Sequence, residues 1–177
     1  MPSRIKVGQI GTGHAHAAGK IASLKRSDDY EIVGVVEPDP ELRAKAEKNP
    51  AYEGVRWLSE EQLLNEDGLK LVAVETQVKD LLDTGARAVA AGKHIHLDKP
   101  AGENLPQFKQ LLDDATRQHL TVQMGYMYRY NPGFQFIFQA VRDGWLGDIF
   151  ALHTVMSKTM SLQARRRLAS EYPSLSN

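Results

Sequence analysis

The chain opens with a short apolar strand that runs straight into a glycine-containing turn. Residues 5–10 read Ile-Lys-Val-Gly-Gln-Ile and are followed at once by Gly11-Thr12-Gly13, after which residues 14–24 have the pattern of a helix. A strand, a tight glycine turn and a helix in this order begin a βαβ unit, in which a right-handed crossover leads to a parallel strand. This opening is typical of folds built on a parallel sheet.

The alternation of strands and helices continues along most of the chain. Further buried strands are predicted at residues 31–36, 69–74, 94–97 and 120–124, with a brief one at 55–57. Helices are predicted at residues 40–48, 78–91 and 104–119, and a short one begins at the capping pair Ser59 and Gln62. Strands that alternate with helices in this way form a parallel sheet covered on both faces. We therefore expect a doubly wound α/β domain of the Rossmann type over residues 1–124.

The pattern changes after residue 124. Asn131-Pro132 opens a helix that ends near residue 143, and an apolar stripe along it, from Phe134 to Val141, needs a partner surface. Residues 148–156 read as a strand, which is not stable without a second strand beside it. We interpret residues 125–177 as the truncated start of a second α/β domain. Unpaired strand edges and exposed apolar faces favour association, so we expect a homo-oligomer. The alternative is that residues after about 125 are disordered.

Composition argues against several classes of protein. Lysine plus arginine and aspartate plus glutamate both number 22, so the formal net charge is zero, which argues against binding to nucleic acid or to anionic membranes. No apolar run of about eighteen residues suggests a transmembrane helix, and residues 1–11 do not read as a signal peptide. The chain has no cysteine, which excludes disulfides, thiolate catalysis and cysteine zinc sites. We expect a cytoplasmic protein.

The glycine turn and one acidic residue suggest a dinucleotide site. Gly11 and Gly13 let the backbone turn tightly and let a pyrophosphate approach the free N–H groups of the helix N-terminus. A third glycine usually follows at position 16, where this chain has His16. Glu37 ends the second strand, where a carboxylate can accept hydrogen bonds from the adenosine ribose and repel a 2′-phosphate. These residues predict NAD, with NADP less favoured. The alternatives are a tight turn without a ligand and a solvated acid at a strand end.

A second motif, Asp98-Lys99-Pro100, closes the strand at residues 94–97. It falls at the C-terminal edge of the predicted sheet, where doubly wound folds bind their ligands. A lysine at this edge can hydrogen-bond to a substrate hydroxyl and stabilise the alkoxide that develops during hydride transfer. Taken alone, a lysine at a strand end is more often a solvated charge.

Two pairs of histidines raise the question of a metal. His14 and His16 flank the glycine turn, and His94 and His96 alternate on a strand. Neither pair has a carboxylate or histidine partner at a known metal-binding spacing. The histidines are therefore interpreted as structural residues, and no metal site is predicted.

Three segments in this order resemble the glucose–fructose oxidoreductase/inositol dehydrogenase (Gfo/Idh/MocA) family. They are residues 5–13, residues 37–40 (EPDP) and residues 90–100 (AAGKHIHLDKP). Residues 125–132 (GYMYRYNP) and 144–149 (GWLGDI) resemble the family's passage from the cofactor domain into the catalytic domain. The resemblance runs from about Arg4 to Met156, and the lysine–proline motif is its most specific part.

The resemblance implies a fold, a reaction and a set of site residues. It implies an N-terminal Rossmann domain, a C-terminal α/β domain with a large, mostly antiparallel sheet, and NAD(P)-dependent oxidation or reduction of a hydroxyl of a sugar, cyclitol or related compound. By resemblance, Lys99 is the catalytic lysine and, together with Arg129, contacts the substrate. The implied cofactor-binding residues are Gly11, Thr12, Gly13, His14, Glu37, Thr76, Asp98, Lys99 and Pro100.

The chain departs from the family pattern in three places. Asp98 replaces the usual glutamate, and Gln77 follows Thr76 where proline is common. The family's catalytic histidine is expected after about residue 175, and the sequence ends at Asn177. We therefore expect a truncated oxidoreductase that is inactive as this chain alone.

Two alternatives remain from the sequence. The first is a non-catalytic dinucleotide-binding module or pseudoenzyme. The second is a methyltransferase-like fold, which also has a glycine turn and an acid after its second strand, but the Asp98-Lys99-Pro100 segment disfavours it.

Overall fold

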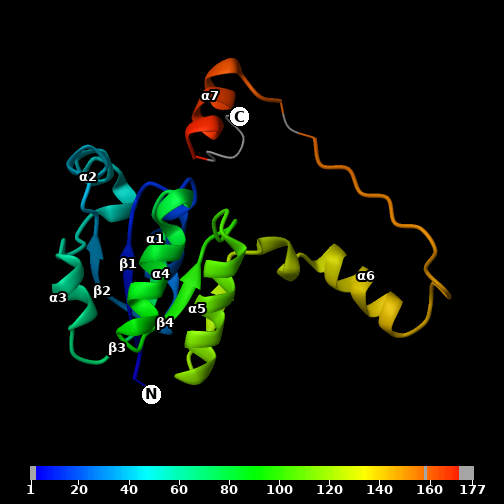
Figure 1. The fold of residues 1–177 in the computed structure, drawn as a ribbon, viewed down its shortest axis with the longest axis horizontal. Helices are drawn as coiled ribbons and strands as arrows, with labels where there is room; N and C mark the ends of the chain where they lie inside the picture. Colours follow the sequence, from blue (N-terminus) through cyan, green and yellow to red (C-terminus); the bar gives the residue numbers. More distant parts are fainter. Residues whose placement is uncertain (1–2, 158, 172–177) are drawn as a thin grey trace.

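A computed structural model of the chain describes residues 3–157 and 159–171 (Figure 1). Its sheet has five parallel strands in the order β2-β1-β3-β4-β5. The strands are β1 (Ile5–Ile10), β2 (Tyr30–Val36), β3 (Leu69–Val74), β4 (His94–Leu97) and β5 (Val122–Met124). The strand order reverses beside β1, which is the topological switch point of a doubly wound fold. The predicted α/β fold is confirmed, while the brief strand predicted at 55–57 is a single parallel bridge between Val35 and Trp57.

Helices pack on the sheet over two apolar cores, one for each face. The helices are α1 (Ala17–Arg26), α2 (Pro40–Glu47), α3 (Glu60–Leu64), α4 (Leu81–Ala90) and α5 (Leu105–Arg117), with the 3-10 turns η1 (Pro50–Tyr52) and η2 (Val78–Asp80). The larger core joins the sheet to α3, α4 and α5 through Leu63, Leu81 and Leu111. The smaller core lies under α1, α2 and η1 and contains Ile21 and Tyr52.

Side-chain caps explain where several helices begin. Ser59 accepts a hydrogen bond from the Gln62 N–H, and the Gln62 side chain accepts one from the Ser59 N–H, so the predicted capping box is confirmed. Asn104 caps α5 in the same manner through the Gln107 N–H. Helix α1 begins three residues later than predicted, because the His14 N–H donates to the Glu75 carbonyl and ties the turn to β3.

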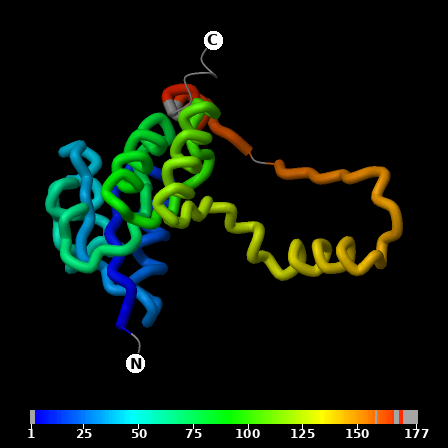
Figure 2. Tube along the Cα trace, turned by 60° about the horizontal axis from the view of Figure 1, so that its bottom comes forward, coloured from blue at the N-terminus to red at the C-terminus, as the bar shows by residue number. Residues whose placement is uncertain are grey.

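The chain after β5 leaves the sheet domain (Figures 1 and 2). It forms the 3-10 turn η3 (Met127–Tyr130), then α6 (Pro132–Arg142) and, after an extended stretch, α7 (Leu162–Glu171). Figure 2 shows the extended stretch leading back toward the sheet domain, where α7 lies. Asn131 caps α6 as the sequence predicts. No helix in the described part of the chain is long and apolar enough to span a membrane.

The strand predicted at residues 148–156 is not formed. These residues are extended but pair with no strand among those that the structure describes. The physical reason is that a strand needs a partner edge, and the described strands pair with one another within a single sheet. The domain division at residue 124 remains a prediction, and its last residues, 172–177, lie outside the described part.

Candidate functional site

All the predicted site residues except Arg129 follow strands at one edge of the sheet. They are Gly11, Thr12, Gly13 and His14 after β1, Glu37 after β2, Thr76 after β3, and Asp98, Lys99 and Pro100 after β4. Parallel strands end at the same edge, so the fold brings these residues together beside the switch point. Arg129 is an exposed residue of η3 and lines a separate cavity along α6.

The glycine turn is packed closely against the end of β3. Gly11 has a φ of +91°, and a Cβ atom on it would lie 2.4 Å from the Thr76 nitrogen. On the other side of β1, the Gly11 N–H donates to the Val36 carbonyl at 2.8 Å. Helix α1 then starts without a side-chain cap and without an acidic residue in its first turn. Its N-terminus therefore suits an anion such as a pyrophosphate.

Glu37 is held against this turn. One carboxylate oxygen accepts hydrogen bonds from the Thr12 N–H at 2.6 Å and from the Thr12 hydroxyl at 2.8 Å. The other oxygen accepts the Asp39 N–H at 3.1 Å. A cavity of about 360 Å³ lies alongside, lined by Gly13, Glu37, Asp39, Leu42, Thr76 and Gln77 among others. The carboxylate is thus fixed at the wall of a cavity beside the turn.

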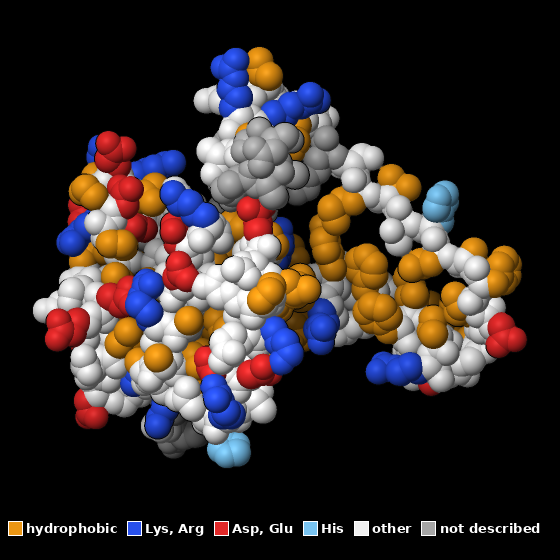
Figure 3. Space-filling model, in the orientation of Figure 1, with side chains coloured by type: hydrophobic (Ala, Val, Ile, Leu, Met, Phe, Trp, Pro, Cys, Tyr) orange, Lys and Arg blue, Asp and Glu red, His pale blue; other side chains and the backbone are white. Residues whose placement is uncertain are grey.

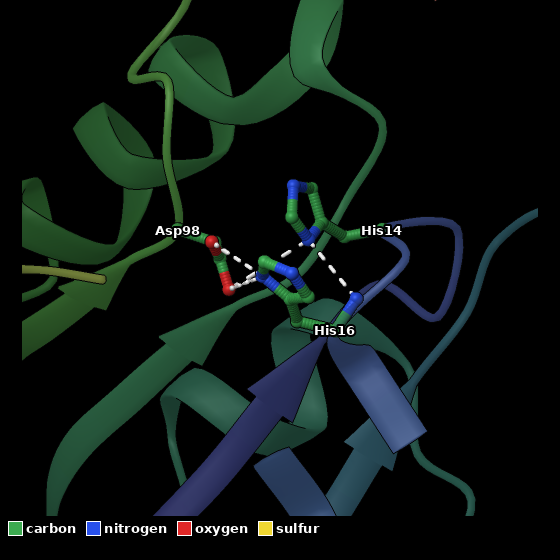
Figure 4. A group of neighbouring side chains, drawn as sticks. All are labelled: His14, His16 and Asp98. Atoms are coloured by element: carbon green, nitrogen blue, oxygen red, sulfur yellow. Dashed lines mark hydrogen bonds and ion pairs between the residues drawn. The ribbon is translucent and has the colours of Figure 1, made fainter. Parts of the chain in front are cut away.

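Asp98 links β4 to the histidines of the turn (Figure 4). Its side chain is buried, and its Oδ1 accepts the Lys99 N–H at 2.6 Å and lies 3.1 Å from His16 Nδ1. Burial alone raises the pKa of Asp98, but the Lys99 N–H and the nearby His14 and His16 outweigh it, so the pKa lies below its ordinary value. Asp98 is therefore ionised at neutral pH. Lys99, half-buried, follows it at the edge of the sheet.

His14 and His16 both approach Asp98, which sequence reasoning missed. His14 Nδ1 lies 3.6 Å from Asp98 Oδ2 and accepts a hydrogen bond from the His16 N–H at 3.2 Å. Burial lowers the pKa of His14, so its imidazole is neutral at pH 7. The histidines lie more than eighty positions from Asp98 in sequence, and no local spacing reveals this contact. Only the sheet topology, which places the loops after β1 and β4 at one edge, points to it.

Glu75 is a second residue that sequence reasoning missed. It directly follows β3 and is fully buried, and neither carboxylate oxygen has a hydrogen-bond partner within the described residues. Its Oε2 lies 3.7 Å from His14 Nδ1 and its Oε1 lies 3.8 Å from His96 Nδ1. Burial, reinforced by the Asp98 charge, raises the pKa of Glu75 to about 8. An acidic residue directly after a buried apolar strand was the signal that the sequence contained.

His96 of β4 lies next to Glu75 and contacts Lys20 of α1. Lys20 Nζ lies 2.9 Å from His96 Nε2. Burial, with the Lys20 charge, lowers the pKa of His96 to about 4. Since an ammonium only donates, His96 Nε2 accepts and the proton of the neutral ring is on Nδ1, facing Glu75. A cavity of about 580 Å³ opens here, lined by His16, Lys20, His96, Asp98 and Tyr126 among others.

Comparison with known proteins identifies the family. Residues 5–126 match the sequence profile of the oxidoreductase family with an NAD-binding Rossmann fold (GFO_IDH_MocA). The chain belongs to this family. Among curated relatives, the uncharacterized oxidoreductase YhhX of Escherichia coli is 30% identical over 128 residues, covering 71% of this chain and 36% of the relative. The rhizopine catabolism protein MocA of Rhizobium meliloti is 27% identical over 149 residues, covering 84% of this chain and 45% of the relative.

Solved structures show the same fold. Scyllo-inositol dehydrogenase from Lactobacillus casei, solved with NAD(H) and scyllo-inositol, superposes with a TM-score of 0.69 at 23% identity, covering 83% of this chain and 43% of that chain. A 3-ketoreductase from Actinomadura kijaniata, solved with NADP, gives a TM-score of 0.67 at 22% identity, covering 80% of this chain and 44% of that chain. The chain spans less than half the length of each of these relatives and structures.

Proposed function

We propose that the chain is the cofactor-binding part of an oxidoreductase that acts on a hydroxyl of a sugar, cyclitol or related compound. Residues 1–124 form the cofactor domain in this proposal, and residues 125–177 begin the catalytic domain. The observation that carries it is the Glu37 carboxylate held on Thr12, beside an uncapped helix N-terminus at the switch point of the sheet. This combination is suited to a ribose and a pyrophosphate in adjacent positions.

The cofactor in this proposal is NAD in preference to NADP. Glu37 accepts ribose hydrogen bonds and repels a 2′-phosphate. The same cavity is lined by Asp39, Asp80 and Asp83, which add negative charge, while its Arg87 is paired with Glu60. Lys79 is the remaining cation of the lining residues. Acidic residues therefore outnumber basic ones around this cavity, which favours a ribose without a 2′-phosphate.

Lys99 is the catalytic residue of the proposal. A bound nicotinamide supplies the hydride acceptor or donor. Lys99 donates a hydrogen bond to the reacting hydroxyl and stabilises the developing alkoxide. Asp98 acts as a positioning residue, because its carboxylate accepts the Lys99 N–H and fixes the start of the loop. Arg129 contributes to substrate binding from η3.

The test is a titration of the purified chain with NADH and with NADPH, followed by nicotinamide fluorescence. We expect NADH to bind at least about tenfold more tightly than NADPH. Hydrogen bonds from the ribose hydroxyls to a charged carboxylate are worth about 1.5–3 kcal/mol each. Glu37→Gln removes this charge, so the affinity for NADH should fall by about tenfold or more. Glu31→Gln, the same substitution at the opposite end of β2, is the control and leaves both affinities unchanged. Equal or tighter binding of NADPH by the unmodified chain would rule out the cofactor assignment.

A further inference from the structure

We infer that His14, His16 and Asp98, with Glu75 beside them, form a binding site for one divalent transition-metal ion, with Zn²⁺ as the best-fitting ion. The inference does not depend on the proposed oxidoreductase function, because it rests on the side chains of the free protein. The four residues come from the ends of three neighbouring strands, β1, β3 and β4. Figure 4 shows the two imidazoles and the Asp98 carboxylate pointing toward one another.

The spacing of the donor atoms fits tetrahedral coordination. One ligand atom each from His14, His16 and Asp98 lie within 4.8 Å of one another. Bonds of about 2.0–2.2 Å from Zn²⁺ to nitrogen and oxygen place tetrahedral ligands about 3.4 Å apart. The observed separations are 3.1 Å from His16 Nδ1 to Asp98 Oδ1, and 3.6 Å from His14 Nδ1 to Asp98 Oδ2. The His14 and His16 donor atoms lie within 4.8 Å of each other, so closing the site around an ion requires a shift of up to about 1.4 Å between them.

Glu75 provides an independent observation that points to a cation. It is fully buried, its two oxygens lack hydrogen-bond partners among the described residues, and Oε2 lies 3.7 Å from His14 Nδ1. A buried carboxylate without partners is costly, and a second carboxylate nearby adds repulsion. With both carboxyl groups ionised and both imidazoles neutral, the four side chains carry a total charge of −2, which a bound divalent ion neutralises. The ion would therefore satisfy the group that the protein leaves unsatisfied.

Residues behind the site orient its ligands. The Nδ1 lone pair of His14 accepts the His16 N–H, so ion binding replaces this hydrogen bond. Lys20 fixes the tautomer of His96, whose Nδ1–H faces Glu75 Oε1 at 3.8 Å. Such outer partners hold metal ligands in place and are a usual part of metal sites.

The donor types select the class of ion. Imidazole nitrogens with carboxylate oxygens suit Zn²⁺ and its first-row neighbours, whereas Ca²⁺ and Mg²⁺ prefer sites made of oxygen alone. The chain has no cysteine that would compete for the ion. His16 is the most exposed of the four side chains, with 34% of it accessible, so it is the one that an ion in solution reaches most easily.

The test uses the full chain without an affinity tag, stripped of metal with EDTA and dialysed. Zn²⁺ is titrated against a chromophoric chelator in the absence of dinucleotide, and Co²⁺ is added separately as a spectroscopic probe. We expect one Zn²⁺ per chain and the intense visible absorption of four-coordinate Co²⁺. His16→Ala, Asp98→Asn and Glu75→Gln should each weaken Zn²⁺ binding by more than about 100-fold, since loss of an outer partner alone costs about 10–100-fold.

His153→Ala is the matched control, because His153 is exposed and lies outside the cluster. It should leave the Zn²⁺ affinity unchanged, and circular dichroism of every variant checks that the sheet domain is folded. The Co²⁺ spectrum of the unmodified chain tests the site even where a variant fails to fold. No binding by the unmodified chain, an octahedral Co²⁺ spectrum, or equal Zn²⁺ affinity in Glu75→Gln or His16→Ala would overturn the inference.

Discussion

Gly11 illustrates how a single residue of the turn is constrained by its neighbours. Its φ is +91°, and an added Cβ atom would meet the Thr76 nitrogen at 2.4 Å. Gly11→Ala should therefore lower the free energy of unfolding by at least about 2 kcal/mol, from backbone strain and steric overlap together. Gly19→Ala on the exposed side of α1 is the control, since nothing lies within 4 Å of that site. There alanine should stabilise the helix by about 0.5–1 kcal/mol. Urea unfolding of both variants checks the contrast, and equal stability would contradict it.

Glu75 should make the metal-free protein less stable as the pH rises. Its pKa is about 8 in the folded chain, against an ordinary value of 4.5. His14 Nδ1 and His96 Nδ1 lie 3.7 and 3.8 Å from its carboxyl oxygens, and the charges of Asp98 and Lys20 also act on it. Below pH 4.5 the residue is protonated in both states and costs nothing. Between pH 4.5 and 8 the unfolded chain loses its proton first, so stability falls by about 1.4 kcal/mol per pH unit from this group. Above pH 8 the cost levels off at about 5 kcal/mol.

Glu75→Gln removes this ionisation. In the presence of EDTA, the variant should exceed the unmodified chain in stability by about 1.4 kcal/mol at pH 5.5 and by about 4–5 kcal/mol at pH 8.5. Urea unfolding at the two pH values measures the difference. A constant difference across this range would show that Glu75 does not titrate there.

At the scale of elements, a glycine in β1 lets α3 pack close to the sheet. A Cβ atom on Gly8 would lie 2.5 Å from Cδ1 of the fully buried Leu63. Gly8→Ala should cost about 1–3 kcal/mol by overpacking, and Leu63→Ala about 2–5 kcal/mol by leaving a cavity. In the double variant the new methyl group enters the space that the leucine vacated. Its cost should be smaller than the sum by about 0.5–3 kcal/mol.

A second double variant controls this cycle. Leu111 is equally buried but packs at Gly85 on α4. Gly8→Ala combined with Leu111→Ala should be additive, because the two side chains share no contact. Thermal and urea unfolding of the six proteins, the unmodified chain included, would show whether the coupling belongs to Leu63 alone.

Elements with a local signal could be predicted from the sequence. Ser59, Asn104 and Asn131 mark helix starts through bonds to N–H groups two or three residues away, and the structure places caps at all three. The start of α1 could not be predicted from the neighbouring residues. The His14 N–H donates a hydrogen bond to the carbonyl of Glu75, which follows β3, and this bond keeps His14 out of the helix. The strand predicted at residues 148–156 was wrong because strand formation depends on a partner and not on its own sequence pattern.

At the scale of the whole molecule, the position of the site could be predicted but its interior could not. The C-terminal edge of a parallel sheet follows from strand order alone, and Gly11, Glu37 and Lys99 were placed there from the sequence. The approach of His14 to Asp98 and Glu75 depends on how three loops fold over that edge. Such contacts join residues far apart in sequence, and a single sequence carries no spacing that encodes them.

The distribution of apolar surface concerns the whole molecule as well. Among the described residues, every exposed large apolar side chain other than Ile5, Leu105 and Leu112 lies between residues 126 and 162. Figure 3 shows these side chains gathered over α6 and the chain that follows it. Apolar surface of this extent favours association. Since no strand forms at residues 148–156, we place the self-contact on the α6 face.

We therefore predict that the chain self-associates through α6. Burying about 500 Å² of apolar surface offsets roughly 12 kcal/mol before the entropy of association is subtracted. Light scattering at increasing micromolar concentration should show a mass above that of the monomer. Replacing both Phe136 and Phe138, which are 63% and 53% exposed, with glutamate should return the chain to a monomer. Leu105→Glu is the control, because Leu105 is 75% exposed on α5 and outside this surface, so it should leave the mass unchanged. An unmodified chain that stays monomeric throughout the range would refute the prediction.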